Sequence, residues 1–241
     1  GCVVEGRLRC PYHHWEYDSH GRCTAIPTQT RVPPSAQVTS YPCEVRHGYL
    51  FFFHGRQPLF PLPFFQGLSP SELVASTRRF QLHFDLPWYF LPGNAFDGQH
   101  FTSVHDRRLL SPLEVDEPEP LTRRVRFRAE VLGDSIFDRL LRRFVGREVR
   151  ISITSHGGPY VLVTGEFGRA TSYILVVCRP IAELESVADV VVFAPRRRSR
   201  LAQLFWQPMT LALRRWFTYG FMADDAQRLS GLRYDPLRMI A

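Results

Sequence analysis

The sequence predicts an α+β protein in which an antiparallel sheet packs around a long C-terminal helix. Apolar and polar residues alternate strictly from Arg123 to Val131, further strand-like segments follow at short intervals, and residues 201–233 have a helical pattern. Short turns favour antiparallel pairing, and strands followed by a helix are typical of the α+β class. The 241 residues, of which 44% are hydrophobic, suffice for one large domain or for a medium and a small one.

The first part of the chain has signals for short strands and turns. Within residues 1–55 the strand-like stretches are Val3–Val4, Leu8 and Tyr49–Phe53. Residues 57–67 contain three prolines and predict a linker. Pro70–Thr77 is expected to form a short helix capped by Ser69.

The second part has longer and more regular elements. The strand at 123–131 has one apolar face, formed by Val125, Phe127, Ala129 and Val131. Residues 134–146 predict an amphipathic helix that ends at Gly146, with the stripe Ile136, Phe137, Leu140, Leu141 and Phe144. Further strands are expected at Glu148–Thr154, Tyr160–Phe167, Thr171–Ile181 and Val187–Phe193. The last helix, Leu201–Arg233, is expected to break near Pro208.

Composition and charge exclude several classes of protein. No apolar run approaches the ~20 residues of a membrane-spanning helix, and five Cys are too few for a disulfide scaffold, so we expect a cytoplasmic protein without a membrane span. The net charge is +7, but the chain lacks the signatures of nucleic-acid binding modules, and nucleic acid is not expected as a partner. The dense run Arg196–Arg200 indicates a solvated loop or a docking face for an acidic electron-transfer partner.

The first chemical motif lies at residues 10–18, where Cys10 and His13 are separated by two residues. Alone, a Cys-x-x-His spacing can occur by chance or can be half of a zinc site. The proline and aromatic residues around it make the segment similar to the second half of a Rieske [2Fe–2S] motif, in which two Cys hold one iron and two His hold the other. The resemblance implies that Cys10 and His13 are cluster ligands and that His14 is a turn variant where the family has Gly.

The first half of that motif, a Cys-x-His pair, does not occur in the sequence, and Cys2 does not fit it. Because the chain starts with Gly1 rather than Met, a missing N-terminal part is the expected explanation, and a degenerate member without a cluster is the rival. Cys23 and Cys43 are expected to be small buried side chains rather than ligands.

The second motif has the pattern N-x-x-D-x-x-H-x-x-x-x-H and comprises Asn94, Asp97, His100 and His105. Five residues separate the two His, about 140° on an ideal helix, so they converge only if the helix ends or distorts between them. Taken alone, the two His fit unrelated surface positions. The whole pattern resembles the mononuclear iron motif of Rieske non-haem iron oxygenases, in which two His and a later carboxylate bind Fe(II).

The resemblance implies a role for each residue of this motif. His100 and His105 would bind Fe(II), Asn94 would be a polar residue near it, and Asp97 would link His100 to His13 of a neighbouring subunit. The third ligand would come from the acidic pair in the last helix, where we expect Asp225 rather than Asp224.

For the whole chain, the resemblance implies the C-terminal half of an all-β Rieske domain (1–55), a linker (56–67) and a helix-grip (START/Bet v 1-like) catalytic domain with an antiparallel sheet (68–241). It implies the terminal oxygenase component of a Rieske-type system. That component would take electrons from a reductase or ferredoxin, and indirectly from NAD(P)H. With O₂ it would hydroxylate, demethylate or desaturate an apolar, aromatic or sterol-like substrate, most simply as a homotrimer.

Two other functions remain open. A sheet wrapped around a helix can hold a ligand without turnover, which would make the chain a helix-grip ligand-binding module. A simple Rieske electron carrier is the weaker alternative, because it has no need of His100, His105 or the C-terminal sheet. The candidates for an apolar pocket are Phe96, Phe101, Val104, Phe205, Trp206, Phe217 and Phe221.

Overall fold

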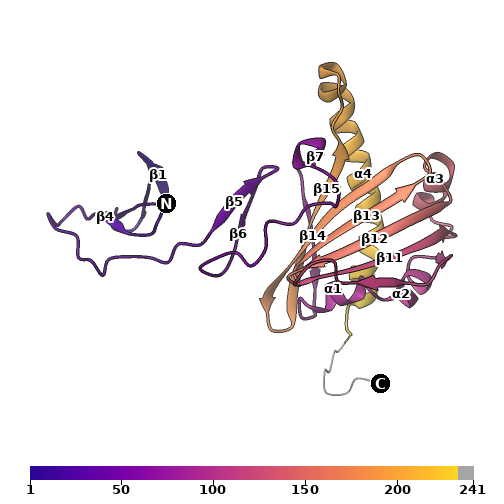
Figure 1. Ribbon diagram of the computed structural model, residues 1–241, viewed down its shortest axis with the longest axis horizontal. Helices are drawn as coiled ribbons and strands as arrows, with labels where there is room; N and C mark the ends of the chain where they lie inside the picture. Colours follow the sequence, from indigo (N-terminus) through magenta and orange to yellow (C-terminus); the bar gives the residue numbers. More distant parts are fainter. Residues whose placement is uncertain (233–241) are drawn as a thin grey trace. The chain divides into compact units, whose positions relative to one another are not determined.

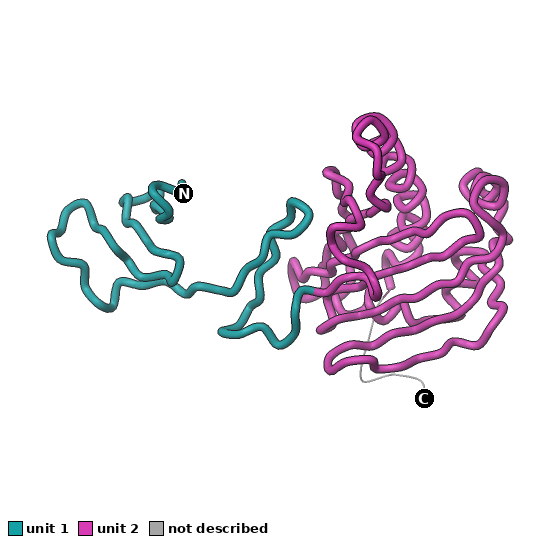
Figure 2. The backbone as a smooth tube through the Cα atoms, turned by 45° about the horizontal axis from the view of Figure 1, so that its top comes forward, with its two compact units in different colours: residues 1–62 teal, residues 63–241 magenta. Residues whose placement is uncertain are grey.

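The computed structural model describes residues 1–232 and separates the chain into two compact units (Figure 2). Unit 1 is Gly1–Leu62, and unit 2 begins at Pro63. The end of the predicted linker belongs to the core of unit 2, because Phe65 is 3% exposed and packs edge-on against Phe193. No helix among the described residues is both long and apolar enough to cross a membrane.

Unit 1 consists of short antiparallel strands. Its four-stranded sheet contains β1 (Cys2–Val4), β2 (Arg7–Arg9), β3 (Glu16–Tyr17) and β4 (Cys23–Ala25), and a separate hairpin contains β5 (Cys43–Arg46) and β6 (Tyr49–Phe52). Gly21 has a φ of +82°, and a Cβ there would lie 2.1 Å from the Val38 carbonyl oxygen, so the turn requires glycine. Cys23 is buried as expected, but the prediction for Cys43 is wrong: it is exposed, because this hairpin leaves most of β5 uncovered.

Unit 2 is built on a nine-stranded antiparallel sheet (Figure 1). Its main path runs β10-β11-β12-β13-β14-β15-β7, with β8 paired to β15 and β9 to β11. The strands are β7 (Leu73–Ala75), β8 (Phe80–Phe84), β9 (Arg107–Leu109), β10 (Glu114–Asp116), β11 (Thr122–Val131), β12 (Glu148–His156), β13 (Tyr160–Phe167), β14 (Thr171–Ala182) and β15 (Glu185–Pro195). The predicted alternation in β11 is confirmed, since Val125, Phe127, Ala129 and Val131 are at most 3% exposed.

Two of the three helices predicted for unit 2 differ from the prediction. The helices of this unit are η1 (Pro70–Glu72), α1 (Phe90–Asn94), α2 (Gly98–Ser103), α3 (Ile136–Phe144) and α4 (Arg200–Leu229). Ser69 caps η1 as expected, but the helix ends after one turn because Leu73–Ala75 pairs with β15. The predicted break of α4 at Pro208 is also wrong.

The course of α4 through Pro208 has a local explanation. Proline removes one backbone hydrogen bond from a helix, but tertiary contacts hold this turn in place. The preceding residue, Gln207, is 4% exposed, donates to the carbonyl oxygen of Pro195 and accepts from the amide of Arg197. Further along, α4 packs against β15 and β8, so its C-terminal half is fixed on the sheet (Figure 1).

Candidate metal centre

The two histidines of the second motif lie on either side of a helix end. Asp97 is the N-cap of α2, and its Oδ1 accepts from the Gln99 amide at 2.9 Å. His100 lies inside α2, while His105 follows the C-cap residue Val104. The helix therefore ends between the histidines, as their convergence requires, and the ring centroids are 4.7 Å apart and nearly perpendicular.

Asp225 of α4 completes a group of three possible ligands. Its Oδ1 lies 2.9 Å from Nε2 of His100 and 3.0 Å from Nε2 of His105. One ligand atom from each residue lies within 4.8 Å of the others. His100 and His105 are buried at 8% and 5% exposure, whereas Asp224 is exposed. Of the two acids in α4, it is therefore Asp225 that meets the histidines.

The atoms of this group are arranged for a cation rather than for one another. Nε2 of His105 and Oδ1 of Asp225 are buried, and no described residue gives either a well-formed hydrogen bond. An unsatisfied buried polar atom costs about 1–3 kcal/mol, and a divalent metal among the three atoms would remove this cost. Two imidazoles and one carboxylate are the donor set of non-haem Fe(II) sites, so the residues fit a mononuclear iron.

The charge state of the carboxylate also suits a metal. Burial is the largest single influence and raises the pKa of Asp225, but the adjacent imidazoles of His100 and His105 together lower it more. The net pKa lies below the ordinary value of an aspartate. The carboxylate is therefore ionised at neutral pH and available as a ligand.

Asn94 and Asp97 occupy different positions relative to the group. Asn94 ends α1, and its side-chain amide nitrogen lies 3.3 Å from Nε2 of His100. The Asn94 side chain therefore points toward the place where the three ligand atoms meet. Asp97 is exposed and serves as a helix cap, so within one chain its role is to start α2.

Neighbouring side chains hold His105 in place, and one of them was not anticipated from the sequence. The ring of Phe221 in α4 stacks on His105 at 3.8 Å and 13°. Arg107 donates from Nη1 to the His105 carbonyl oxygen at 2.6 Å and pairs through Nη2 with Oδ1 of Asp138 at 2.7 Å. Its guanidinium also lies over the Phe221 ring at 5.6 Å. Nothing in the sequence distinguishes Arg107 from the many other arginines.

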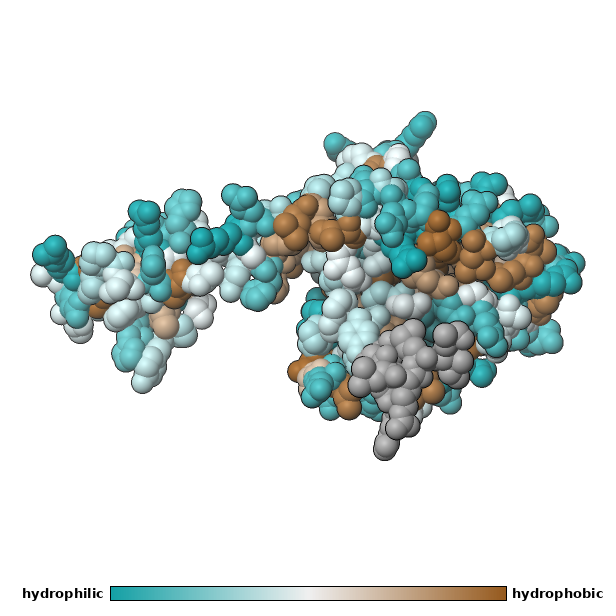
Figure 3. Space-filling view, turned by 60° about the horizontal axis from the view of Figure 1, so that its bottom comes forward, coloured by the Kyte–Doolittle hydropathy of each residue, from teal (hydrophilic) through white to brown (hydrophobic). Residues whose placement is uncertain are grey.

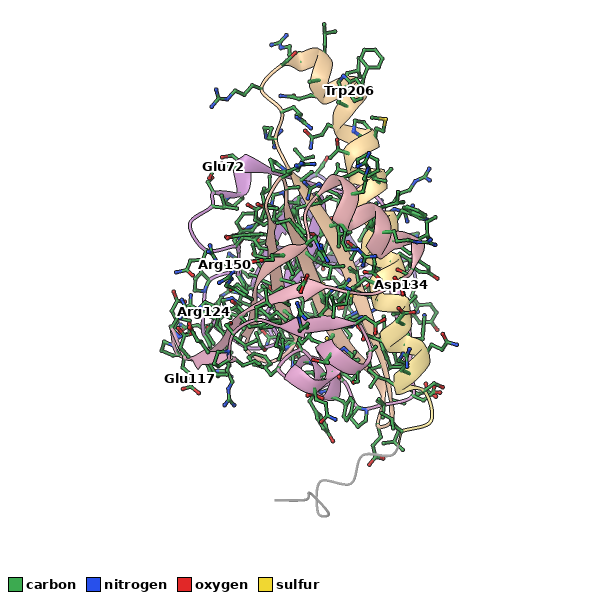
Figure 4. All side chains as sticks on the ribbon, turned by 90° about the vertical axis from the view of Figure 1, so that its right-hand side faces the viewer. Glu72, Glu117, Arg124, Asp134, Arg150 and Trp206 are labelled. Carbon is green, nitrogen blue, oxygen red and sulfur yellow. The ribbon has the colours of Figure 1, made fainter. Side chains whose placement is uncertain are left out.

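The predicted aromatic pocket is wrong for two of its members. Phe205 and Trp206 are 67% and 59% exposed, and Trp206 lies about 28 Å from Asp225 along the helix, at 1.5 Å per residue. Figure 4 shows Trp206 where α4 extends past the sheet. Phe101 belongs to the core, where it packs on Phe127 and anchors α2 to the sheet.

In unit 1, Cys10 and His13 lie on one tight turn. The His14 amide donates to the Cys10 carbonyl oxygen at 3.0 Å, and the Cys10 amide donates to the carbonyl oxygen of Trp15 at 2.9 Å. His14 has a φ of +57°, the left-handed region that favours glycine. This conformation explains why a glycine is expected at the position. His13 is exposed and Cys10 half-buried, so both side chains are available on the same turn.

Comparisons with known proteins agree with both units. A family model described as Rieske [2Fe-2S] domain matches residues 1–42. Protein TIC 55 of Pisum sativum is 26% identical over 223 residues, which cover 85% of this chain and 38% of that protein. Cholesterol 7-desaturase nvd 1 of Ciona intestinalis is 31% identical over 108 residues, which cover 44% of this chain and 23% of that protein.

The same fold occurs in solved structures. The crystal structure of dicamba monooxygenase bound to dicamba aligns with a TM-score of 0.65 at 19% identity, over 95% of this chain and 70% of that one. The chain carries a Rieske [2Fe–2S] domain at residues 1–42, and it has the fold of Rieske oxygenase structures, with a large antiparallel sheet and a C-terminal helix. It spans less than two fifths of the length of the two relatives named above.

Proposed function

We propose that this chain is part of the terminal oxygenase component of a Rieske-type system. The observation that carries the proposal is the convergence of His100 Nε2, His105 Nε2 and Asp225 Oδ1, with His105 Nε2 and Asp225 Oδ1 left without hydrogen-bond partners among residues 1–232. His100, His105 and Asp225 would hold an iron ion, which would supply the redox chemistry that activates O₂.

The chain's own residues have distinct roles in this proposal. The carboxylate of Asp225 and the two imidazoles would hold the metal, and Asn94 places its side-chain amide nitrogen 3.3 Å from Nε2 of His100. Phe221 stacks on the ring of His105, and Arg107 holds the backbone of His105 by donating to its carbonyl oxygen. Burial of these ligands in unit 2 limits the access of water to the site.

Electrons would arrive from a reductase or ferredoxin, and indirectly from NAD(P)H. Cys10 and His13 would contribute two ligands of the [2Fe–2S] cluster. We propose that the exposed carboxylate of Asp97 bridges His100 and the cluster side of a neighbouring copy, which requires an oligomer, most simply a homotrimer. Exposure of Asp97 on the surface of unit 2 supports this role.

We propose that the substrate is an apolar ring compound of the aromatic or sterol-like class. The names of the relatives, a cholesterol desaturase and a dicamba monooxygenase, support the proposal by analogy. The reaction would be hydroxylation, demethylation or desaturation.

The proposal is tested by turnover in a pair of matched variants. Full-length protein reduced anaerobically is mixed with O₂ and a panel of sterols and aromatic acids, and products are identified by mass spectrometry. We expect Asp225→Ala to abolish turnover and Asp224→Ala, which alters an exposed acid one position away, to preserve it. Turnover that survives in folded Asp225→Ala would contradict the proposal.

A ligand-binding module without turnover accounts less well for the site. Such a module has no use for the buried carboxylate of Asp225 and the imidazole of His105, whose unsatisfied atoms, among the residues that the structure describes, cost stability without a metal. It would be supported if the metal-free protein and the His100→Ala, His105→Ala double variant bound the same apolar ligand equally well and wild type gave no product.

A further inference from the structure

The N-terminal half of α4 has a stripe of exposed apolar side chains. They recur at intervals of four, four, four and three residues, which places them on one side of a helix. They are Leu201 at 71%, Phe205 at 67%, Met209 at 55%, Leu213 at 54% and Trp216 at 47% exposure. We refer to these five residues as the α4 stripe. It is about 22 Å long at 1.5 Å per residue, and Leu204 and Trp206 flank it at 67% and 59% exposure.

The α4 stripe is not the side of the helix that packs on the sheet. The buried residues of α4 are Gln207, Leu211, Thr218 and Leu229. At 100° per residue these positions point roughly opposite to the stripe. Apolar side chains thus gather on the outer side of α4 as well. Unit 2 also has hydrophobic areas on the face drawn in Figure 3. Contiguous exposed apolar surface marks an interaction site.

Basic residues adjoin the beginning of the stripe. Arg196, Arg197, Arg198 and Arg200 are all exposed, and no acidic residue occurs between Val190 and Ala223. The loop is tied to the helix, because Gln203 donates to the Arg197 carbonyl oxygen at 2.6 Å and Gln207 accepts from the Arg197 amide at 3.0 Å. The basic cluster is therefore held beside the first turns of the stripe.

We propose that the α4 stripe and the Arg196–Arg200 cluster bind the surface of an anionic membrane. Helices that lie in the membrane interface combine an apolar face with adjoining basic residues and aromatic side chains. The guanidinium groups would contact anionic headgroups, and Phe205, Trp206 and Met209 would enter the boundary between headgroups and acyl chains. A purely polar redox partner would account for the arginines but not for the apolar stripe.

This mode of binding does not require a membrane span and does not depend on the iron site. Attraction to anionic lipid is electrostatic and falls with salt, whereas burial of the stripe does not. Membrane binding is therefore expected to require both the Arg196–Arg200 cluster and the α4 stripe. Each can be removed by substitution of exposed residues without disturbing the core.

The first experiment is co-sedimentation of the full chain with sucrose-loaded vesicles. Vesicles of equal parts phosphatidylcholine and phosphatidylglycerol are compared with vesicles of phosphatidylcholine alone, at low and high salt. We expect binding to the anionic vesicles, weaker binding at high salt, and a blue shift of tryptophan fluorescence that is reduced in Trp206→Phe. Absence of binding to anionic vesicles overturns the proposal. This holds even if the protein associates with itself or binds an acidic ferredoxin.

Variants locate the binding surface. Arg197→Gln, Arg198→Gln and Arg200→Gln together are expected to weaken binding roughly a hundredfold, since each basic residue contributes about a factor of five. The control with the same charge change elsewhere, Arg31→Gln, Arg56→Gln and Arg123→Gln, removes three exposed arginines and is expected to change binding far less. Equal loss in both sets would mean that net charge alone drives binding and would overturn the proposal.

The apolar half of the surface has its own test. Phe205→Ser and Met209→Ser together are expected to remove the fluorescence shift and lower vesicle binding at high salt at least tenfold. Metal content and circular dichroism of every variant are expected to match those of wild type. Unchanged binding in this double variant would show that the stripe does not enter the membrane and would overturn the proposal.

Discussion

Replacement of Arg107 by Leu is expected to destabilise unit 2 by about 3–5 kcal/mol, the cost of leaving one partner of a buried ion pair alone. The pair with Asp138 is 2.7 Å long, and the side chains of Arg107 and Asp138 are only 7% and 12% exposed. The substitution also removes the donor to the His105 carbonyl oxygen and the cation over Phe221. Several contacts at the metal centre therefore depend on this one side chain.

The assay is urea unfolding followed by tryptophan fluorescence, with Arg108→Leu as the matched control. Arg108 follows directly in β9 but is 61% exposed, and its partner Glu130, which is 14% exposed, also pairs with Arg147. Loss of Arg108 is therefore expected to cost no more than about 1 kcal/mol. The double variant Arg107→Leu, Asp138→Leu is expected to recover much of the loss, because neither charge is then left unpaired. A cost below about 1 kcal/mol for Arg107→Leu, or strictly additive effects in the double variant, would refute the reasoning.

The same substitution tests whether Arg107 positions His105. Removal of groups that orient a metal ligand commonly lowers metal affinity about 10–100-fold. We expect a loss of this size when Co²⁺ is titrated into metal-free Arg107→Leu, with affinity retained in Arg108→Leu. If Arg107→Leu bound Co²⁺ as tightly as wild type, its role would be structural only.

Two further predictions concern other parts of the chain. Gly21→Ala is expected to destabilise unit 1 by more than about 1 kcal/mol, because a Cβ there meets a carbonyl oxygen at 2.1 Å. Gly6→Ala, also at positive φ but in open space, is expected to cost less. Equal shifts of the melting temperature in the two variants would contradict this prediction. Burial raises the pKa of Cys178 to about 12, so iodoacetamide at about pH 8 is expected to label exposed Cys43 and to leave Cys178 unlabelled until the protein unfolds. Mass spectrometry of the peptides distinguishes the two sites, and labelling of Cys178 in the folded protein would show that its burial is transient.

The elements with a strong periodic pattern were predictable from the sequence. In β11 every second residue enters the core, so alternation alone defines the strand and its buried face. The prediction of a break at Pro208 was wrong because the local sequence does not show what holds this turn of α4. The hydrogen bonds of Gln207 with Pro195 and Arg197 form only when the preceding loop folds back on the helix. The strand β7 was missed for a similar reason, since its pairing with β15 joins segments distant in sequence.

The candidate site was predictable in part. The resemblance of the motif to the mononuclear iron motif pointed to His100, His105 and the acidic pair, and the structure brings Asp225 to both histidines. Their role as iron ligands and the roles of Asn94, Asp97, Cys10 and His13 stay predictions, as does the cytoplasmic location. Arg107 could not be recognised, because its importance comes from burial against Asp138 and Phe221, which only the fold creates.

The central claim is that His100, His105 and Asp225 hold one mononuclear iron. It is tested most directly by counting iron and acid-labile sulfide in full chain purified anaerobically with Fe(II). A [2Fe–2S] cluster contributes equal numbers of each, so iron in excess of sulfide measures the second site whether or not the cluster is complete. We predict an excess of about one iron per chain in wild type and Asp224→Ala, and none in Asp225→Ala. No excess in wild type, or an equal excess in folded Asp225→Ala, would contradict the claim.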